Sequence, residues 1–514
     1  MKKLLYLSFV AALSLLFSGL AIAETIVIKP EYGQRVIAPD NDQTISILIK
    51  FKARPLPPQS ARNPLSLALV IDRSGSMDEA GKMNYAKLAA RDLINRLGDK
   101  DQLSLITYDS KVQLLKPLTK MSGANKSAFI KIVNDIYASG STNLSGGMQE
   151  GFKQLIKADS AGVKRVILLS DGLANVGETT PSRIAALAAN ARQKGITLTA
   201  MGMGLDYDED LMQLIAQRGG GRYYYIRNAE DSSMFFNRDL DGALASVSRN
   251  IKLLITLDDK VQDIKVYGYT LSGEGRTRHI EISDFYADEE RLMIIEMRVA
   301  KAEPGELNLG AIELNYEDIA DKGQVALVMP MIISVDADAA RQEQSRNKDV
   351  QVEVAAMRAN ENYSNALSAA SDGRFEEAEQ IMTQAKAELA ANPMTAQSER
   401  LALQQRSLDV EEQRLRSAAA APAPAQQDFI KTAKVMVYNT NTGNLNSLQM
   451  QEGSQGLEVE LLQKTLNGLG YYNGPIDGNY SQAVAAAVQK FQADNGLASD
   501  GVAGPDTQNA LGLY

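Results

Sequence analysis

Apolar residues between positions 64 and 249 fall in short runs that alternate with longer segments of helical periodicity. The runs are Leu65–Ile71, Gln102–Tyr108, Arg165–Leu169, Ile196–Met201 and Arg222–Ile226. Helical spacing between them is clearest in Met83–Leu97 and Arg183–Gln193. Buried strands alternating with amphipathic helices predict a doubly wound α/β domain with a mostly parallel sheet, which we assign to residues 61–249.

Period-two alternation flanks this domain on both sides. Residues 24–60 place four apolar side chains on one face: Ile45, Ile47, Ile49 and Phe51. Residues 250–337 return to the same alternation and predict a β-sandwich-like domain. Our hypothesis is that the N-terminal strands join the later ones in one sandwich, with the α/β domain inserted between them.

Residues 338–417 are rich in Ala, Glu, Gln and Arg, and predict about three helices with breaks near Gly373 and Pro393. The turn at Gly373 resembles a single tetratricopeptide unit. Because about three such units are needed for a solenoid, we interpret the segment as a packed helical spacer rather than a peptide-binding groove.

Residues 418–427 contain Pro422 and Pro424 and predict a semi-rigid Ala/Pro linker. Residues 428–452 remain unassigned, apart from a candidate strand at Val435–Tyr438. The last module, residues 453–514, returns to helical spacing.

The first 23 residues have the pattern of an export signal. Lys2 and Lys3 precede the apolar stretch Leu4–Leu20, and Ala21-Ile22-Ala23 provides a small-residue cleavage site. This predicts a Sec-type signal peptide over residues 1–23, the alternative being an uncleaved membrane anchor. We expect an exported protein of a Gram-negative periplasm or cell envelope, with no transmembrane segment after signal cleavage.

Two absences limit the chemistry. The 514 residues contain no cysteine and a single histidine, His279. Thiol nucleophiles, disulfides, lipid-modified cysteine and His-rich zinc sites are therefore excluded. His279 lies in an alternating stretch with no nucleophile motif nearby, so we expect a half-exposed strand residue and no Ser/His/Asp triad.

The formal net charge of −9 argues against nucleic acid as a partner. Composition leaves open a lysozyme-like carboxylate pair, but no segment resembles such a domain. We therefore predict that the protein is not an enzyme.

Three elements with hydroxyl and carboxylate side chains lie in the predicted α/β domain. Asp72-Arg73-Ser74-Gly75-Ser76 follows the strand Leu65–Ile71, Thr142 lies in a loop before a helix, and Asp171 follows the strand Arg165–Leu169. The sequence resembles the von Willebrand factor A (vWA) family. Its metal-ion-dependent adhesion site, or MIDAS, uses these elements in this order.

The resemblance implies a divalent-metal site made by Asp72, Ser74, Ser76, Thr142 and Asp171. Hard oxygen ligands suit Mg²⁺ best, with Mn²⁺ or Ca²⁺ as alternatives. In the family the remaining ligand is often a carboxylate of a partner protein. The competing interpretation is that Asp72, Ser74 and Ser76 merely cap the following helix.

The last module resembles a small three-helix peptidoglycan-binding domain. Its pattern includes Gly470-Tyr471-Tyr472-Asn473-Gly474 and two Asp-Gly turns, at Asp477-Gly478 and Asp500-Gly501. Ser481 and Val484 depart from the family pattern, which puts the first turn's geometry in doubt. Exposed tyrosines are the candidate peptidoglycan contacts: Tyr471, Tyr472 and Tyr480.

Together these features predict an exported, wall-docked adhesion or scaffold protein. It would bind a protein partner through a divalent metal and peptidoglycan through its C-terminal domain. One alternative is a recruiting or assembly factor for an envelope complex that uses the helical region as a second surface. A cell-wall hydrolase is the other alternative.

Overall fold

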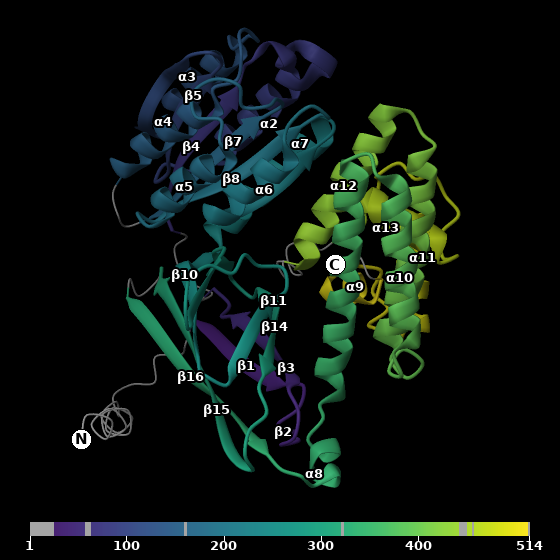
Figure 1. The fold of residues 1–514 in the computed structure, drawn as a ribbon. Coiled ribbons are helices and arrows are strands. Elements are labelled where there is room, and N and C mark those ends of the chain that lie inside the picture. Colours follow the sequence, from purple (N-terminus) through teal and green to yellow (C-terminus); the bar gives the residue numbers. More distant parts are fainter. Residues whose placement is uncertain are drawn as a thin grey trace, which may run out of the picture.

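The computed structural model describes residues 25–56, 63–158, 162–319, 323–441, 450–454 and 457–511. The predicted signal peptide, residues 1–23, lies outside these ranges. In Figure 1 the α/β domain lies above a β-sandwich, and a helical region runs alongside both. None of the helices within the described ranges combines the length and apolarity needed to span a bilayer.

The α/β domain is built on a six-stranded sheet in the order β6-β5-β4-β7-β8-β9. All neighbouring pairs are parallel except β5 and β6. The strands are β4 (Leu65–Asp72), β5 (Gln102–Tyr108), β6 (Val112–Lys120), β7 (Val163–Ser170), β8 (Ile196–Met203) and β9 (Gly220–Ile226). The predicted doubly wound fold is confirmed. Sequence periodicity misses β6 because none of its side chains is fully buried.

Helices cover both faces of this sheet. One face packs against α4 (Leu144–Ile156), α5 (Pro181–Arg192) and α6 (Glu209–Arg218). The other packs against α2 (Lys82–Arg96), α3 (Gly123–Asn134) and α7 (Ala229–Leu244). The five strands other than β6 are buried along almost their whole length, which explains their continuous apolar runs.

The β-sandwich combines strands from both sides of the α/β domain. One sheet has the order β1-β3-β14-β11, and the other β12-β10-β15-β16-β2 with β13 paired to β10. Its strands are β1 (Ile26–Tyr32), β2 (Val36–Ile37), β3 (Gln43–Ala53), β10 (Ser246–Leu257), β11 (Val261–Val266), β12 (Thr277–Ile282), β13 (Phe285–Tyr286), β14 (Glu290–Val299), β15 (Gly305–Asp318) and β16 (Gln324–Val335). Because β3 pairs along its length with β14, the α/β domain is inserted between β3 and β10.

Buried arginines join the α/β domain to the sandwich. Arg165 on β7 is 1% exposed, and its Nη1 lies 3.0 Å from Asp239 Oδ1 and donates to the Tyr286 hydroxyl at 2.9 Å. Arg222 on β9 pairs with Glu289 of the sandwich at 2.8 Å. Such charges are tolerated in a dry interface because each has an opposite charge or hydrogen-bond acceptor beside it.

The helical region contains α8 (Ala339–Gln344), α9 (Lys348–Ser371), α10 (Phe375–Ala391), α11 (Glu399–Ala419) and α12 (Ala423–Asn441). Residues 338–417 thus hold four helices where about three were predicted. The predicted linker at 418–427 is wrong, because α12 begins at Ala423 and places Pro424 in its first turn, where a missing N–H costs nothing. The candidate strand Val435–Tyr438 is also wrong, since it lies within α12.

The helical region is docked on its neighbours rather than projecting from them. Against the sandwich, Val350 and Val354 of α9 pack on Leu48 and Ile294. Arg358 of α9 also donates to Glu296 at 2.6 Å. The predicted helical spacer is therefore packed against the sandwich.

Helix α12 docks on the α/β domain. Lys431 Nζ lies 2.6 Å from Glu209 at the start of α6, and the Tyr225 hydroxyl donates to Asp428 at 2.9 Å. The rings of Tyr223 and Tyr438 meet edge-on. These contacts cover the β9 edge of the sheet.

The C-terminal module consists of α13 (Leu457–Gly468), α14 (Gln482–Asp494) and α15 (Pro505–Ala510). Arg227, just after β9, pairs with Glu460 of α13 at 2.5 Å. The module therefore contacts the α/β domain directly as well as lying beside α11 and α12 (Figure 1).

Substituting Arg165→Met should lower the free energy of unfolding by about 3–5 kcal/mol, because it leaves Asp239 buried without its counter-charge. Urea unfolding followed by circular dichroism measures this. Arg96→Met is the matched control, since Arg96 and Asp241 form a surface pair that is 40% and 61% exposed. It should cost about 1 kcal/mol or less. Equal effects of the two variants would contradict a structural role for the buried network.

The docking of α12 should weaken in acid. Burial raises the pKa of Glu209, but hydrogen bonding and attraction from Lys431 and Lys434 outweigh it and hold the pKa at about 2. A depressed carboxyl pKa stabilises the fold above the unfolded value near 4.3, and this contribution is lost as the pH falls toward 2. Wild type should therefore be more stable than Glu209→Gln at pH 6, and most of the difference should vanish by pH 2–3. A pH-independent difference would contradict this linkage.

Candidate functional site

The predicted metal-site residues meet at the carboxyl edge of the central strands. Asp72 is the last residue of β4, and Asp171 follows the end of β7. Strands β4 and β7 are parallel neighbours, so their ends deliver both carboxylates to one place. This is the edge at which open α/β sheets bind ligands.

Asp72 is fully buried and held by both of its oxygens. Its Oδ1 accepts the backbone N–H of Ser74 at 2.8 Å, and Oδ2 accepts the Ser170 hydroxyl at 2.9 Å. Burial raises the pKa of the Asp72 carboxyl to about 6, partly offset by the Ser74 N–H and reinforced by the nearby charge of Asp171. A cation beside such a carboxylate stabilises its ionised form.

The two serines of the first loop converge on Asp171. The Ser76 hydroxyl lies 2.9 Å from Asp171 Oδ1, the Ser74 hydroxyl 3.4 Å from the same atom, and the two hydroxyls 3.2 Å apart. Ser74 is the N-cap of the following 3₁₀ segment η2 (Gly75–Gly81), but its side chain makes no capping hydrogen bond. The interpretation that these residues merely cap a helix therefore fails for Ser74.

Thr142 completes the set. It is 3% exposed, and its backbone N–H donates to Asn175 Oδ1 at 2.8 Å. A Cβ added at Gly172 would lie 3.2 Å from Thr142 Oγ1 and 3.6 Å from Ser76 Oγ. The hydroxyls of Thr142 and Ser76 therefore both lie close to Gly172. All five predicted residues thus lie together at the carboxyl edge of the sheet.

Sequence reasoning missed Lys82, the first residue of α2. It is buried, and its Nζ donates to Asp171 Oδ2 at 2.9 Å and lies 3.6 Å from Asp206. Gly204, at φ +69°, leaves room for it, because a Cβ there would lie 2.7 Å from Lys82 Cε. Nothing local marks this lysine, since exposed lysines commonly occur at such positions.

The donor set fits a hard divalent cation. It offers two carboxylates and three hydroxyls, all oxygen, which is what Mg²⁺, Mn²⁺ and Ca²⁺ prefer. Over the described residues there is no cluster of three or more His, Cys, Asp and Glu side chains arranged to hold a metal. A metal here would therefore depend on Ser74, Ser76 and Thr142 as much as on the two carboxylates.

Two of the three candidate tyrosines of the C-terminal module are buried. Tyr472 is 4% exposed and donates its hydroxyl to Pro475 O at 3.0 Å; Tyr480 is 2% exposed and donates to Gly501 O at 2.9 Å. Only Tyr471 is half-buried, edge-on to Phe491. The expectation of exposed contacts is wrong for Tyr472 and Tyr480, because so small a module needs large aromatic side chains for its core.

The departures from the family pattern do not distort the first turn. Ser481 has φ −80°, in the ordinary extended region, and stands at the N-cap position of α14 without a side-chain capping hydrogen bond. Gly478, at φ +69°, takes the left-handed position. Buried Gln463 accepts the backbone N–H groups of Asp477 and Gly478 at 3.0 and 2.8 Å. Val484 is fully buried in the module's core.

His279 lies half-buried on β12 of the sandwich, and its backbone pairs with Ser272. It belongs to a different domain from the oxygen-rich cluster. Its position agrees with the expectation of an ordinary strand histidine.

Residues 66–238 match the family model of the von Willebrand factor type A domain, and residues 455–511 match that of a putative peptidoglycan binding domain. Both predicted resemblances are thereby confirmed at the level of the domains. The chain carries a vWA domain and, at its C-terminal end, a domain of the peptidoglycan-binding family.

Relatives are distant. The uncharacterized protein sll0103 of Synechocystis sp. is 27% identical over 312 residues, covering 58% of this chain and 72% of that protein. The uncharacterized protein YfbK of Escherichia coli is 28% identical over 236 residues, 45% of this chain and 40% of its own length. Inter-alpha-trypsin inhibitor heavy chain H1 of Mesocricetus auratus is 28% identical, over 43% of this chain and 26% of that one.

The similarity in fold to solved structures extends beyond the vWA domain. A von Willebrand factor type A protein from Catenulispora acidiphila superposes with a TM-score of 0.63 at 16% identity, over 83% of this chain and 99% of that one. The ArnB paralog VWA2 from Sulfolobus acidocaldarius gives 0.54 at 16% identity, over 81% and 98%. At this identity the likeness concerns fold alone.

Proposed function

We propose that this protein is a non-enzymatic, exported adhesion or scaffold protein of the cell envelope. Its vWA domain would bind a protein partner through a divalent metal, and its C-terminal domain would bind peptidoglycan. The observation that carries the proposal is the gathering of Asp72, Ser74, Ser76, Thr142 and Asp171 at one edge of the sheet.

These five residues would hold the metal as a MIDAS, with Mg²⁺ the best match and Mn²⁺ or Ca²⁺ as alternatives. The cation would supply an electrophilic position for a partner's carboxylate. The protein's own contribution is to hold the oxygens in place. Ser74 N–H and the Ser170 hydroxyl fix Asp72, and Lys82 fixes Asp171.

Lys82 also takes part in the charge balance of the site. Two ionised carboxylates would neutralise a divalent cation, and the charge of the Lys82 ammonium is offset by Asp206, which lies 3.6 Å from its Nζ. The loaded site would then be near neutral and would not repel an acidic partner.

The surroundings of the site suit a protein partner. Leu173, two residues beyond Asp171, is 58% exposed. Tyr137, which lies against Arg73 with the guanidinium 5.4 Å from its ring centre, is 67% exposed. Exposed apolar and aromatic side chains around a polar site are typical of protein interfaces.

The envelope location is supported by the C-terminal family match and by the signal-like pattern of residues 1–23. Enzyme activity has little support, because the chain has no cysteine and one histidine, which lies on a sandwich strand.

Substituting Asp72→Ala should abolish binding of Mg²⁺ or Mn²⁺ in isothermal titration calorimetry while circular dichroism shows a retained fold. Asp78→Ala is the matched control, because Asp78 is an exposed carboxylate in the same loop and should leave metal affinity unchanged. Unaltered metal binding by the Asp72 variant would remove the metal site from the proposal.

The mature protein should co-sediment with purified sacculi, and a chain ending at Asn441 should stay in the supernatant. The cut follows α12 because Phe429 and Ile430 belong to the helical core. Circular dichroism and the thermal transition of the shortened chain establish that it is folded. Equal sedimentation of both chains would contradict wall binding by the C-terminal domain.

A further inference from the structure

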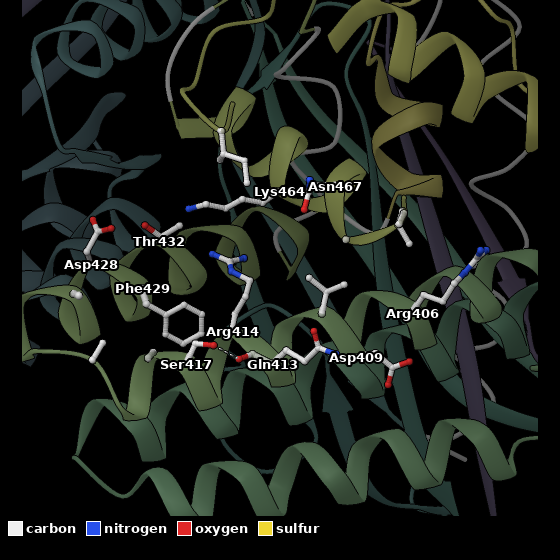
Figure 2. Close-up of a pocket in the computed structure, with 17 residues that line it drawn as sticks. Arg406, Asp409, Gln413, Arg414, Ser417, Asp428, Phe429, Thr432, Lys464 and Asn467 are labelled. Atoms are coloured by element: carbon white, nitrogen blue, oxygen red, sulfur yellow. Dashed lines mark hydrogen bonds between the residues drawn. The ribbon is translucent and has the colours of Figure 1, made fainter. Parts of the chain in front are cut away.

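Lys82 differs from other paired cations of the protein in the carboxylate that it uses. Figure 2 shows Arg414 and Lys464 in the groove between α11, α12 and the C-terminal module, and each pairs with a glutamate on its own helix. The partner of Lys82 is Asp171, which belongs to the candidate metal site. The same carboxylate would therefore serve both the lysine ammonium and a bound metal.

The pair between Lys82 and Asp171 is buried on both sides. The two side chains are 7% and 0% exposed, and Lys82 Nζ lies 2.9 Å from Asp171 Oδ2. The other oxygen of Asp171, Oδ1, lies 2.9 Å from the Ser76 hydroxyl and 3.4 Å from that of Ser74. One carboxylate thus separates the ammonium from two of the hydroxyls that are proposed to hold the metal.

The charge of Lys82 has opposite effects on the site without a metal and with one. Asp72 and Asp171 are both fully buried, and buried carboxylates without a counter-charge are costly, so the ammonium stabilises the metal-free site. A divalent cation bound to the same carboxylates brings a like charge close to the ammonium. Their repulsion is little screened by salt because both charges are buried. Lys82 therefore opposes metal binding.

A second acceptor lies within reach of the ammonium. Asp206 Oδ2 is 3.6 Å from Lys82 Nζ, and the Asp206 side chain is 64% exposed. Within the described ranges Asp206 has no other ion-pair partner. The distance is longer than a hydrogen bond, so a small rotation of this exposed side chain would convert the contact into a direct one.

The backbone on both sides of Asp206 is held in place. The next residue, Tyr207, is buried, and its carbonyl accepts a hydrogen bond from Lys431 of α12 at 2.8 Å. On the other side Gly204 leaves room for the lysine stem, since a Cβ there would lie 2.7 Å from Lys82 Cε. An exchange of partners by Lys82 therefore needs side-chain rotation alone.

We propose that Lys82 is a built-in counter-ion of the metal site. It neutralises the buried carboxylates when no metal is bound, and it passes from Asp171 to Asp206 when a metal binds. The inference rests on the proposed metal site and describes its regulation. Metal affinity is kept below the value that the oxygen ligands alone would give, so occupancy follows the metal concentration around the protein.

The first test compares Lys82→Met with wild type by calorimetry with Mg²⁺. Methionine has a similar length but no charge, so the variant should bind Mg²⁺ at least about 10-fold more tightly. In EDTA it should unfold at a lower urea concentration than wild type, and saturating Mg²⁺ should remove most of that difference. Lys87→Met is the matched control, because it removes a positive charge from the same helix, where Lys87 Nζ donates to the Asn134 carbonyl at 3.0 Å. It should leave Mg²⁺ affinity unchanged.

Asp206→Asn tests the second acceptor, and it alters an exposed side chain that folding does not require. It should weaken Mg²⁺ binding several-fold when Lys82 is present, because the displaced ammonium loses its acceptor. In the Lys82→Met background the same substitution should have little effect, so the two changes should not be additive. Asp78→Asn, an exposed carboxylate in the loop after β4, controls for the loss of one negative charge.

Mg²⁺ binding by Lys82→Met that equals or falls below that of wild type overturns the proposal, since Lys82 would then only position Asp171. If Lys82→Met does not fold, unchanged binding by Asp206→Asn overturns it. Equal effects of Asp206→Asn in both backgrounds overturn the exchange as well. These outcomes leave the metal site standing, whereas a wild-type protein that binds no Mg²⁺ removes the metal site and this proposal with it.

Discussion

The buried arginine network between the vWA domain and the sandwich is the constraint on which the architecture depends. Arg165 and Arg222 lie on strands β7 and β9, yet their partners include sandwich residues such as Tyr286 and Glu289. Desolvated charges tolerate little displacement, because moving one group leaves its partner uncompensated. The domains are therefore held in one relative orientation, which directs the carboxyl edge of the vWA sheet away from the sandwich.

Two further contacts extend this fixed arrangement to the rest of the chain. Helix α9 packs on β3, and α12 packs on the β9 edge through Lys431 and Asp428. The C-terminal module is joined to the α/β domain by the ion pair between Arg227 and Glu460. As a result the candidate metal site and the C-terminal module belong to one packed arrangement.

Much of the fold could be predicted because burial on both faces gives continuous apolar strands, as in Leu65–Ile71. The cluster of Asp72, Thr142 and Asp171 was also predictable, because strand ends meet at one edge whatever the loops between them do. Each of these signals consists of residues close together in the sequence, so it could be recognised without knowledge of any distant partner.

What could not be predicted depends on distant partners. Lys431 meets Glu209 across 222 positions, and Lys82 meets Asp171 across 89, so neither residue differs locally from a surface lysine. Pro422 and Pro424 suggest a linker in the sequence. The structure shows instead that α11 ends at Ala419 and that α12 begins at Ala423, so the prolines lie at a helix start. Tyrosine is a residue type that often contacts ligands, which made Tyr472 and Tyr480 candidates. The module is so small that both side chains are needed in its core.

The insertion of the vWA domain has a mechanical consequence. Its chain enters from β3 and leaves into β10, and these strands lie in opposite sheets of the sandwich. A pull applied by a partner at the carboxyl edge would be divided between two covalent connections, each continuing into a strand hydrogen-bonded on both sides. Tension would thus reach both sheets at once and load their ladders along the strands, a geometry that resists unzipping.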